Sequence, residues 1–274
     1  MWARRIAATL LGAAVVAATG AAATTAEVTM PGKLFAPREL DVLVGTTVTW
    51  RNTDHSTHTV TEDDDVFDSG HIRPGGEFAQ AFTRTGTFEF HCTIHRFMRG
   101  VVSVFDVVLR GPAEPLPAGR RARLEGLAPA NATEVVLDRL VPGPPQPIAR
   151  AQPGEDGAFA FVVRAPEPRR YRVRAGSARS PVVRVRVSPR VGIERAQDGI
   201  AVLAVPSRAG SRVALQTYDR ESFAWVTVAR GRLDSRSRAR IEYRAEARSY
   251  VRAVVLGRAD WSDGASRPLV LMPG

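Results

Sequence analysis

Short segments in which apolar and polar residues alternate run through most of the chain, and they constrain its fold more than any other feature. In the stretch GTTVTW, Val48 and Trp50 fall on one face and threonines on the other. In TFEFHC, Phe88, Phe90 and Cys92 share a face in the same way. A period of two residues is typical of strands with one buried face, and we find no long segment with a helical period. The sequence therefore predicts an all-β fold.

The second half of the chain carries this alternation in two related units. One unit ends in YRVRAGSARSPVVRVRVSP (171–189) and the other in YVRAVVLGRADWSDGASRPLVLMP (250–273). Both show a strand led by tyrosine, a turn rich in small residues, and a serine before a closing strand. We therefore expect two immunoglobulin-like β-sandwiches, which here lack the disulfide of that fold.

Charge and proline content divide the chain near residue 110. Residues 27–108 hold 7 basic and 12 acidic residues, a net charge of −5, whereas the following residues hold 29 and 16, a net charge of +13. The stretch RGPAEPLPAG has the proline content of a stiff linker. We expect a first domain at 27–108, a proline-rich linker at 109–118, and β-sandwich domains at 119–188 and 189–274.

Residues 1–26 have the composition of a secretory signal peptide. Arg4 and Arg5 precede the apolar run IAATLLGAAVVAA, and small residues lead to a cleavage site at Ala26. The apolar run is shorter than the roughly 20 residues that a bilayer requires, and no later segment is apolar enough to span one. We therefore expect an exported protein that lies in the periplasm, in the cell envelope or outside the cell, and that does not span a membrane.

Cys92 is the only cysteine, so it has no intramolecular partner in the oxidising compartment that export implies. In FHCTIHRFMRG it is followed by His95 and Met98, each three residues further on. With a second imidazole, this thiolate, imidazole and thioether form a type 1, or blue, copper set: two histidines and a cysteine in a plane, with a weak axial methionine. The upstream stretch WRNTDHSTHTV offers either His55 or His58.

The order of these motifs over residues 33–105 resembles the cupredoxin family, and within it the plastocyanin- and amicyanin-like small blue-copper proteins. The matching stretches are F-x-P (35–37), VGTTVTWRNTD (44–54), HTV (58–60), F-x-S-G (67–70), PGGEF (74–78) and GTFEFHCTIHRFMRGVVSV (86–104). The short C-x-x-H-x-x-M loop is most similar to that of amicyanin. The resemblance implies a Greek-key β-sandwich that binds one copper ion through His58, Cys92, His95 and Met98.

The remaining histidines are expected to lie outside the copper set. His55 sits where the family has a loop residue that is not a ligand, His91 faces away from Cys92, and His71 has no ligand partner by spacing. Thr59 stands where many relatives carry an asparagine that braces the cysteine loop. We expect the hydroxyl of Thr59, together with Thr93, to brace it here.

For function, the resemblance implies a one-electron carrier that cycles between Cu(II) and Cu(I) and is not an enzyme. The five histidines of the chain are too few for the additional copper centres of a multicopper oxidase. An alternative is a protein for copper binding, copper delivery or cell-envelope adhesion without a carrier role. In this family electrons usually leave at the C-terminal histidine ligand, here His95. Ile94, Phe97 and Met98 would form an apolar rim there for a redox partner.

The arginines of the second half alternate with valines, which is typical of solvated strand faces. We find no nucleic-acid motif and no basic platform with aromatic residues, so we expect no nucleic-acid binding. Binding of this Arg-rich half to an anionic cell envelope is an alternative that the sequence leaves open.

Overall fold

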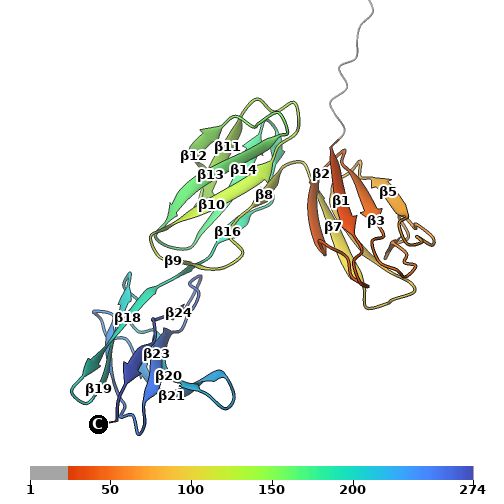
Figure 1. Ribbon diagram of the computed structural model, residues 1–274. Helices are drawn as coiled ribbons and strands as arrows, with labels where there is room; N and C mark the ends of the chain where they lie inside the picture. Colours follow the sequence, from red (N-terminus) through yellow and green to blue (C-terminus); the bar gives the residue numbers. More distant parts are fainter. Residues whose placement is uncertain (1–23, 274) are drawn as a thin grey trace, which may run out of the picture.

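The computed structural model describes residues 24–273, and these residues form β-strands and no α-helix (Figure 1). Three clusters of buried apolar side chains follow one another along the chain, at residues 28–104, 107–187 and 200–271. The strands around each cluster belong to separate sheets. The all-β fold that the alternation predicts is therefore confirmed. Within the described residues no helix is long and apolar enough to cross a membrane.

The first sandwich contains β1 (Thr25–Thr29), β2 (Glu39–Leu43), β3 (Thr47–Arg51), β4 (Thr61–Glu62), β5 (Glu77–Ala81), β6 (Gly86–His91) and β7 (Arg99–Phe105). One sheet has the order β1-β3-β5 and the other the order β2-β7-β6-β4. The pairs β1–β3 and β2–β7 are parallel, and the remaining pairs are antiparallel. Because β1 and β3 belong to one sheet and β2 to the other, the first three strands already contribute to both sheets of the sandwich.

Trp50 lies at the centre of this first core. Its side chain is fully buried, and its ring centroid lies 5.3–6.4 Å from those of Phe67, Phe78, Phe82 and Phe90. Aromatic rings at such distances pack favourably beyond the burial of their area. The inward direction of Trp50 is the one that the alternation of β3 predicts.

Two strand ends position the residues that carry the chemistry. Phe90 on β6 is buried, and Cys92, just after that strand, is buried on the same side. Strand β4 pairs with the end of β6, with Thr61 opposite His91. The segment that carries His58 therefore runs beside Cys92, although the two are far apart in sequence.

The second sandwich contains β8 (Val108–Arg110), β9 (Leu116–Pro117), β10 (Arg120–Leu127), β11 (Val135–Leu140), β12 (Gln146–Ala151), β13 (Ala158–Ala165), β14 (Arg169–Ala175), β15 (Ala178–Arg179), β16 (Val183–Val185) and β17 (Val187–Ser188). The third contains β18 (Arg190–Ala196), β19 (Gly199–Val205), β20 (Arg212–Asp219), β21 (Ala224–Arg232), β22 (Arg238–Glu242), β23 (Ser249–Val255), β24 (Gly264–Ala265) and β25 (Leu269–Leu271).

The second and third sandwiches share one topology. Their smaller sheets have the orders β13-β10-β8 and β22-β19-β18, and their larger sheets the orders β12-β11-β14-β15 and β21-β20-β23-β24. In both larger sheets a further strand, β16 or β25, pairs with the third strand. A register shift follows Leu137 in one and Leu215 in the other. The two units are therefore structural repeats, and the immunoglobulin-like assignment stays a prediction.

A buried serine performs the same task in each repeat. The hydroxyl of Ser180 accepts a hydrogen bond from the backbone N–H of Val173 (2.9 Å), and that of Ser266 accepts one from Ala253 (3.1 Å). These bonds align Val173 with Ala253. The tyrosines of the sequence comparison are consequently offset by one residue, and Tyr171 corresponds to Val251 rather than to Tyr250.

The segment expected to be a linker, 109–118, lies largely within the second sandwich. Leu109 and Arg110 belong to β8, which pairs with β10, and Leu116 and Pro117 form β9, which pairs with β17. Proline is compatible with short or edge strands because it removes only one backbone hydrogen-bond donor. A high proline content therefore did not exclude strands here.

The N-terminal boundary also differs from the expected one. Residues 1–23 of the predicted signal peptide lie outside the described residues. Thr25 and Ala26 belong to β1 and pair with Thr47 and Val48 of β3. Cleavage after Ala26, as the sequence predicts it, would remove both residues from the sheet.

Candidate metal centre

Three side chains from two distant segments meet in the first sandwich. Sγ of Cys92 lies 3.9 Å from Nδ1 of His58 and 3.7 Å from Nδ1 of His95, and the donor atoms of the three all lie within 4.8 Å of one another. Cys92 and His58 are fully buried, whereas His95 is partly exposed. A thiolate and two imidazoles at this spacing suit a single copper ion, and thiolate favours Cu(I).

The loop from Cys92 to Met98 is short and held by its own backbone. The N–H of Cys92 donates to the carbonyl of Met98 (3.2 Å), and the N–H of Met98 donates to that of His95 (2.8 Å). The loop therefore turns His95 toward Cys92 and directs Met98 inward. Met98 is 2% exposed and packs in the same core as Cys92. This excludes the methionine from the surface rim in which we expected it.

Thr59 braces the cysteine loop as the sequence predicts. Its Oγ1 accepts a hydrogen bond from the backbone N–H of Thr93 (2.8 Å) and lies 3.1 Å from the Thr93 hydroxyl. Its own backbone N–H points at Sγ of Cys92 (3.3 Å). A donor aimed at the sulfur stabilises the thiolate, and such neighbours of a metal ligand tune the metal.

Replacing Thr59 with valine tests this brace. The change keeps the shape of the side chain but removes the acceptor of the Thr93 N–H. We expect a loss of about 1–3 kcal/mol in the free energy of unfolding and a shifted reduction potential. Chemical denaturation and voltammetry measure the two effects, and Thr59→Ser should restore both. Equal behaviour of the valine variant and the wild type would show that the brace has no role.

Asp54 orients His58, a role that we did not foresee. Its Oδ2 lies 2.9 Å from Nε2 of His58, and Asn52 fixes the loop by accepting the N–H of Asp54 at 3.0 Å. The hydrogen bond with His58 is the main cause that lowers the pKa of Asp54. A proton on Nε2 leaves Nδ1 of His58 free to face Cys92. In the sequence, the four-residue spacing between Asp54 and His58 was the pattern from which this contact could have been predicted.

Burial also prepares His95 for a metal. Desolvation lowers the pKa of its imidazole, and the charge of His58 adds to the effect. A lowered pKa keeps the ring neutral at neutral pH, and only the neutral ring can ligate a metal.

The other histidines lie outside this group. His55 and His71 are exposed. His91 is half-buried, and its Nδ1 lies 2.5 Å from Oδ1 of Asp63 at the surface. The choice of His58 over His55 is thus consistent with the structure.

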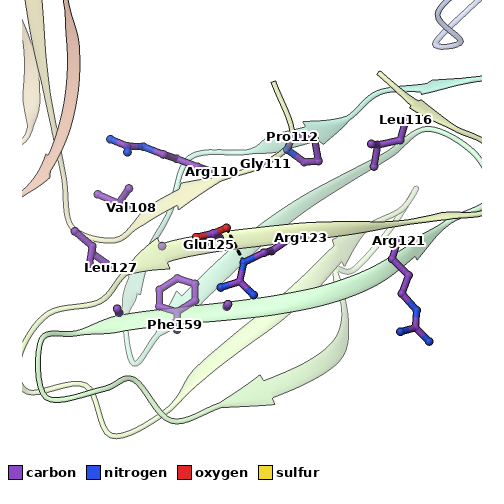
Figure 2. A pocket seen from close by; sticks show the side chains of 13 residues that line it. Val108, Arg110, Gly111, Pro112, Leu116, Arg121, Arg123, Glu125, Leu127 and Phe159 are labelled. Atoms are coloured by element: carbon purple, nitrogen blue, oxygen red, sulfur yellow. Dashed lines mark hydrogen bonds and ion pairs between the residues drawn. The ribbon is translucent and has the colours of Figure 1, made fainter. Parts of the chain in front are cut away.

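A large groove elsewhere in the molecule offers no comparable chemistry. It measures about 900 Å³ and opens where β8 leaves β10 near Pro112. Figure 2 shows its arginines, of which Arg123 pairs with Glu125; Arg110 pairs with Asp41 of the first sandwich. Two of its three arginines therefore have an acidic partner, and no cysteine or histidine is among its lining residues, so the groove carries no functional assignment.

The fold and these residues define a small β-sandwich with a buried Cys–His–His metal site. Residues 5–104 match the family model of the cupredoxin-like domain, and this part of the chain belongs to the cupredoxin family. Amicyanin of Paracoccus denitrificans is 38% identical over 71 residues, which cover 24% of this chain and 54% of amicyanin. The chain thus spans about half the length of this curated relative.

Solved structures of cupredoxins match the chain as well. A purple cupredoxin from Nitrosopumilus maritimus is 28% identical, with 29% of this chain and 98% of that chain covered and a TM-score of 0.28. The Cu(I) form of an amicyanin variant is 32% identical, with 30% and 82% covered and a TM-score of 0.28.

Proposed function

We propose that this chain is an exported type 1 copper protein that carries single electrons. The observation that supports the proposal most directly is the convergence of Cys92, His58 and His95 on one buried point. Copper bound there would supply one-electron exchange between Cu(II) and Cu(I). Met98 is proposed as the residue that would supply the fourth ligand, because it is buried in the same core as Cys92.

The protein's own residues would prepare the site for electron exchange. Two imidazole nitrogens and a thiolate suit both copper charges, so the site needs little rearrangement. The hydrogen bond from the backbone N–H of Thr59 to Cys92, and the one that Asp54 accepts from His58, hold the metal-binding side chains in place before the metal binds. Burial of Cys92 and His58 keeps water away from the thiolate and limits its oxidation.

Electrons would enter and leave at His95, the partly exposed ligand. The side chains of Ile94 and Phe97 beside it are 46% and 73% exposed, and the rings of His95 and Phe97 lie 6.1 Å apart. A small apolar surface of this kind suits the brief docking of a redox partner. The two repeats that follow would tether or space the copper domain, or bind a partner.

Reversible cycling separates a carrier from a protein that delivers copper. The copper-loaded protein should show an intense visible absorption from the thiolate–copper bond, lose it on titration with one equivalent of reductant, and regain it on reoxidation. The copper should stay bound to the protein in the presence of an apo-acceptor. Rapid transfer of the copper to the acceptor, without reversible cycling, would favour delivery instead.

A further inference from the structure

A cavity in the third sandwich is lined by three arginines and no acidic residue. It measures about 300 Å³ and lies at the end of the larger sheet where β20 begins and β23 ends. Arg212, Arg232 and Arg258 line it together with Gly210 and Ser211. This end of the sheet is remote from the copper site, which lies in the first sandwich.

The three arginines line one cavity. A carboxylate lies beside it, because Asp263 accepts the backbone N–H of the lining residue Gly257 (2.6 Å). Arg212 lies directly opposite Arg232 on neighbouring strands, and like charges at opposed positions destabilise a sheet. Arg232 donates to the carbonyl of Gly210 (2.8 Å), and a Cβ built on Gly210 would lie 3.7 Å from a guanidinium nitrogen of Arg258. Among residues 24–273 none of the three forms an ion pair.

Ser211 adds a neutral donor to the same cavity. The residue is 3% exposed and lines the cavity. An oxyanion bound there would accept a hydrogen bond from its hydroxyl.

The second sandwich shows that the fold does not require these arginines. Alignment through Leu137 and Leu215 places Glu134 at the position of Arg212, and Gln152 at that of Arg232. The positive cluster is therefore a property of the third sandwich alone.

Arg258 belongs to a segment that the second sandwich lacks. Strands β23 and β24 are joined by residues 256–263, whereas Gly176 and Ser177 alone join the equivalent strands β14 and β15. Next to Arg258, Ala259 adopts a left-handed φ of 57°, which costs a residue other than glycine free energy. This loop places Arg258 in the lining of the cavity.

We propose that this cavity binds a phosphate-type oxyanion. Planar guanidinium groups recognise the paired oxygens of phosphate through two parallel hydrogen bonds, and three of them with a hydroxyl would surround one phosphoryl group. The cavity is larger than a free phosphate ion requires, so the phosphoryl group of a phosphodiester polymer also fits. Free phosphate and the polymer offer the same phosphoryl oxygens and differ only in the molecule that carries them.

Calorimetric titration of the whole chain with inorganic phosphate, and separately with poly(glycerol phosphate), tests the proposal at constant ionic strength. Arg232→Gln, which copies Gln152 of the second sandwich, and Arg258→Ala should each weaken binding about tenfold. Arg240→Gln and Arg220→Ala are matched controls away from the cavity and should bind as the wild type does. Circular dichroism confirms that each variant is folded.

Either source of phosphate supports the proposal if the cavity variants lose affinity and the controls do not. Tight binding of inorganic phosphate alone would identify the free ion as the ligand, and binding of the polymer alone would identify the phosphodiester. Equal weakening in all four variants would overturn the proposal, because it indicates attraction to net charge only. Absence of binding to both probes would overturn it as well.

Discussion

Replacing Cys92 with serine should abolish the intense visible absorption of the copper-loaded protein. That absorption depends on a copper–thiolate bond, and Cys92 supplies the only thiolate in the chain. The hydroxyl of serine is nearly isosteric but is a far poorer ligand for Cu(I), so copper affinity should fall as well. Absorption spectra and copper titrations of the wild type and the variant measure both effects.

The fold itself should survive this substitution. Serine keeps an acceptor for the backbone N–H of Thr59, so the free energy of unfolding of the copper-free protein should change by about 1 kcal/mol. His71→Ala, at an exposed histidine outside the site, is the matched control and should keep the full absorption. A coloured Cys92→Ser protein would mean that another residue holds the copper.

Replacing Trp50 with alanine should cause the largest loss of stability. The indole fills the centre of the first core among four phenylalanine rings, and removal of such a side chain costs about 3–5 kcal/mol. The second and third cores share no side chain with the first. Calorimetry should therefore show one transition at lower temperature and the others unchanged.

Two comparisons sharpen this test. Copper loading should raise the transition of the first sandwich alone, because ligand binding stabilises the folded state that holds it. Trp50→Phe keeps most apolar contacts and removes an indole N–H that has no hydrogen-bond partner within residues 24–273, so it should cost much less. If Trp50→Ala shifted every transition equally, the three sandwiches would form one cooperative unit instead.

The sequence predicted the strands, and it singled out the residues that meet at the candidate metal centre, because both depend on local patterns. The period of two placed Trp50 and Phe90 inward, and the spacing of Cys92, His95 and Met98 marks a loop that needs only one distant histidine. The bracing by Thr59 was also predictable, since its position follows directly from that of His58.

The remaining features depend on contacts that no local pattern carries. The hydrogen bond from His58 to Asp54 arises from the path of one loop, and the burial of Met98 arises from the tightness of another. The arginine cavity joins two strands and a loop, so only the fold brings Arg212, Arg232 and Arg258 together.

X-ray absorption at the copper edge of the loaded protein tests the central claim most directly. We predict one short copper–sulfur bond from Cys92 and two copper–nitrogen bonds from His58 and His95, in both oxidation states. In the Cys92→Ser variant the short sulfur contribution should vanish. A wild-type spectrum with only nitrogen and oxygen neighbours would contradict the account, because the thiolate would then not bind the metal.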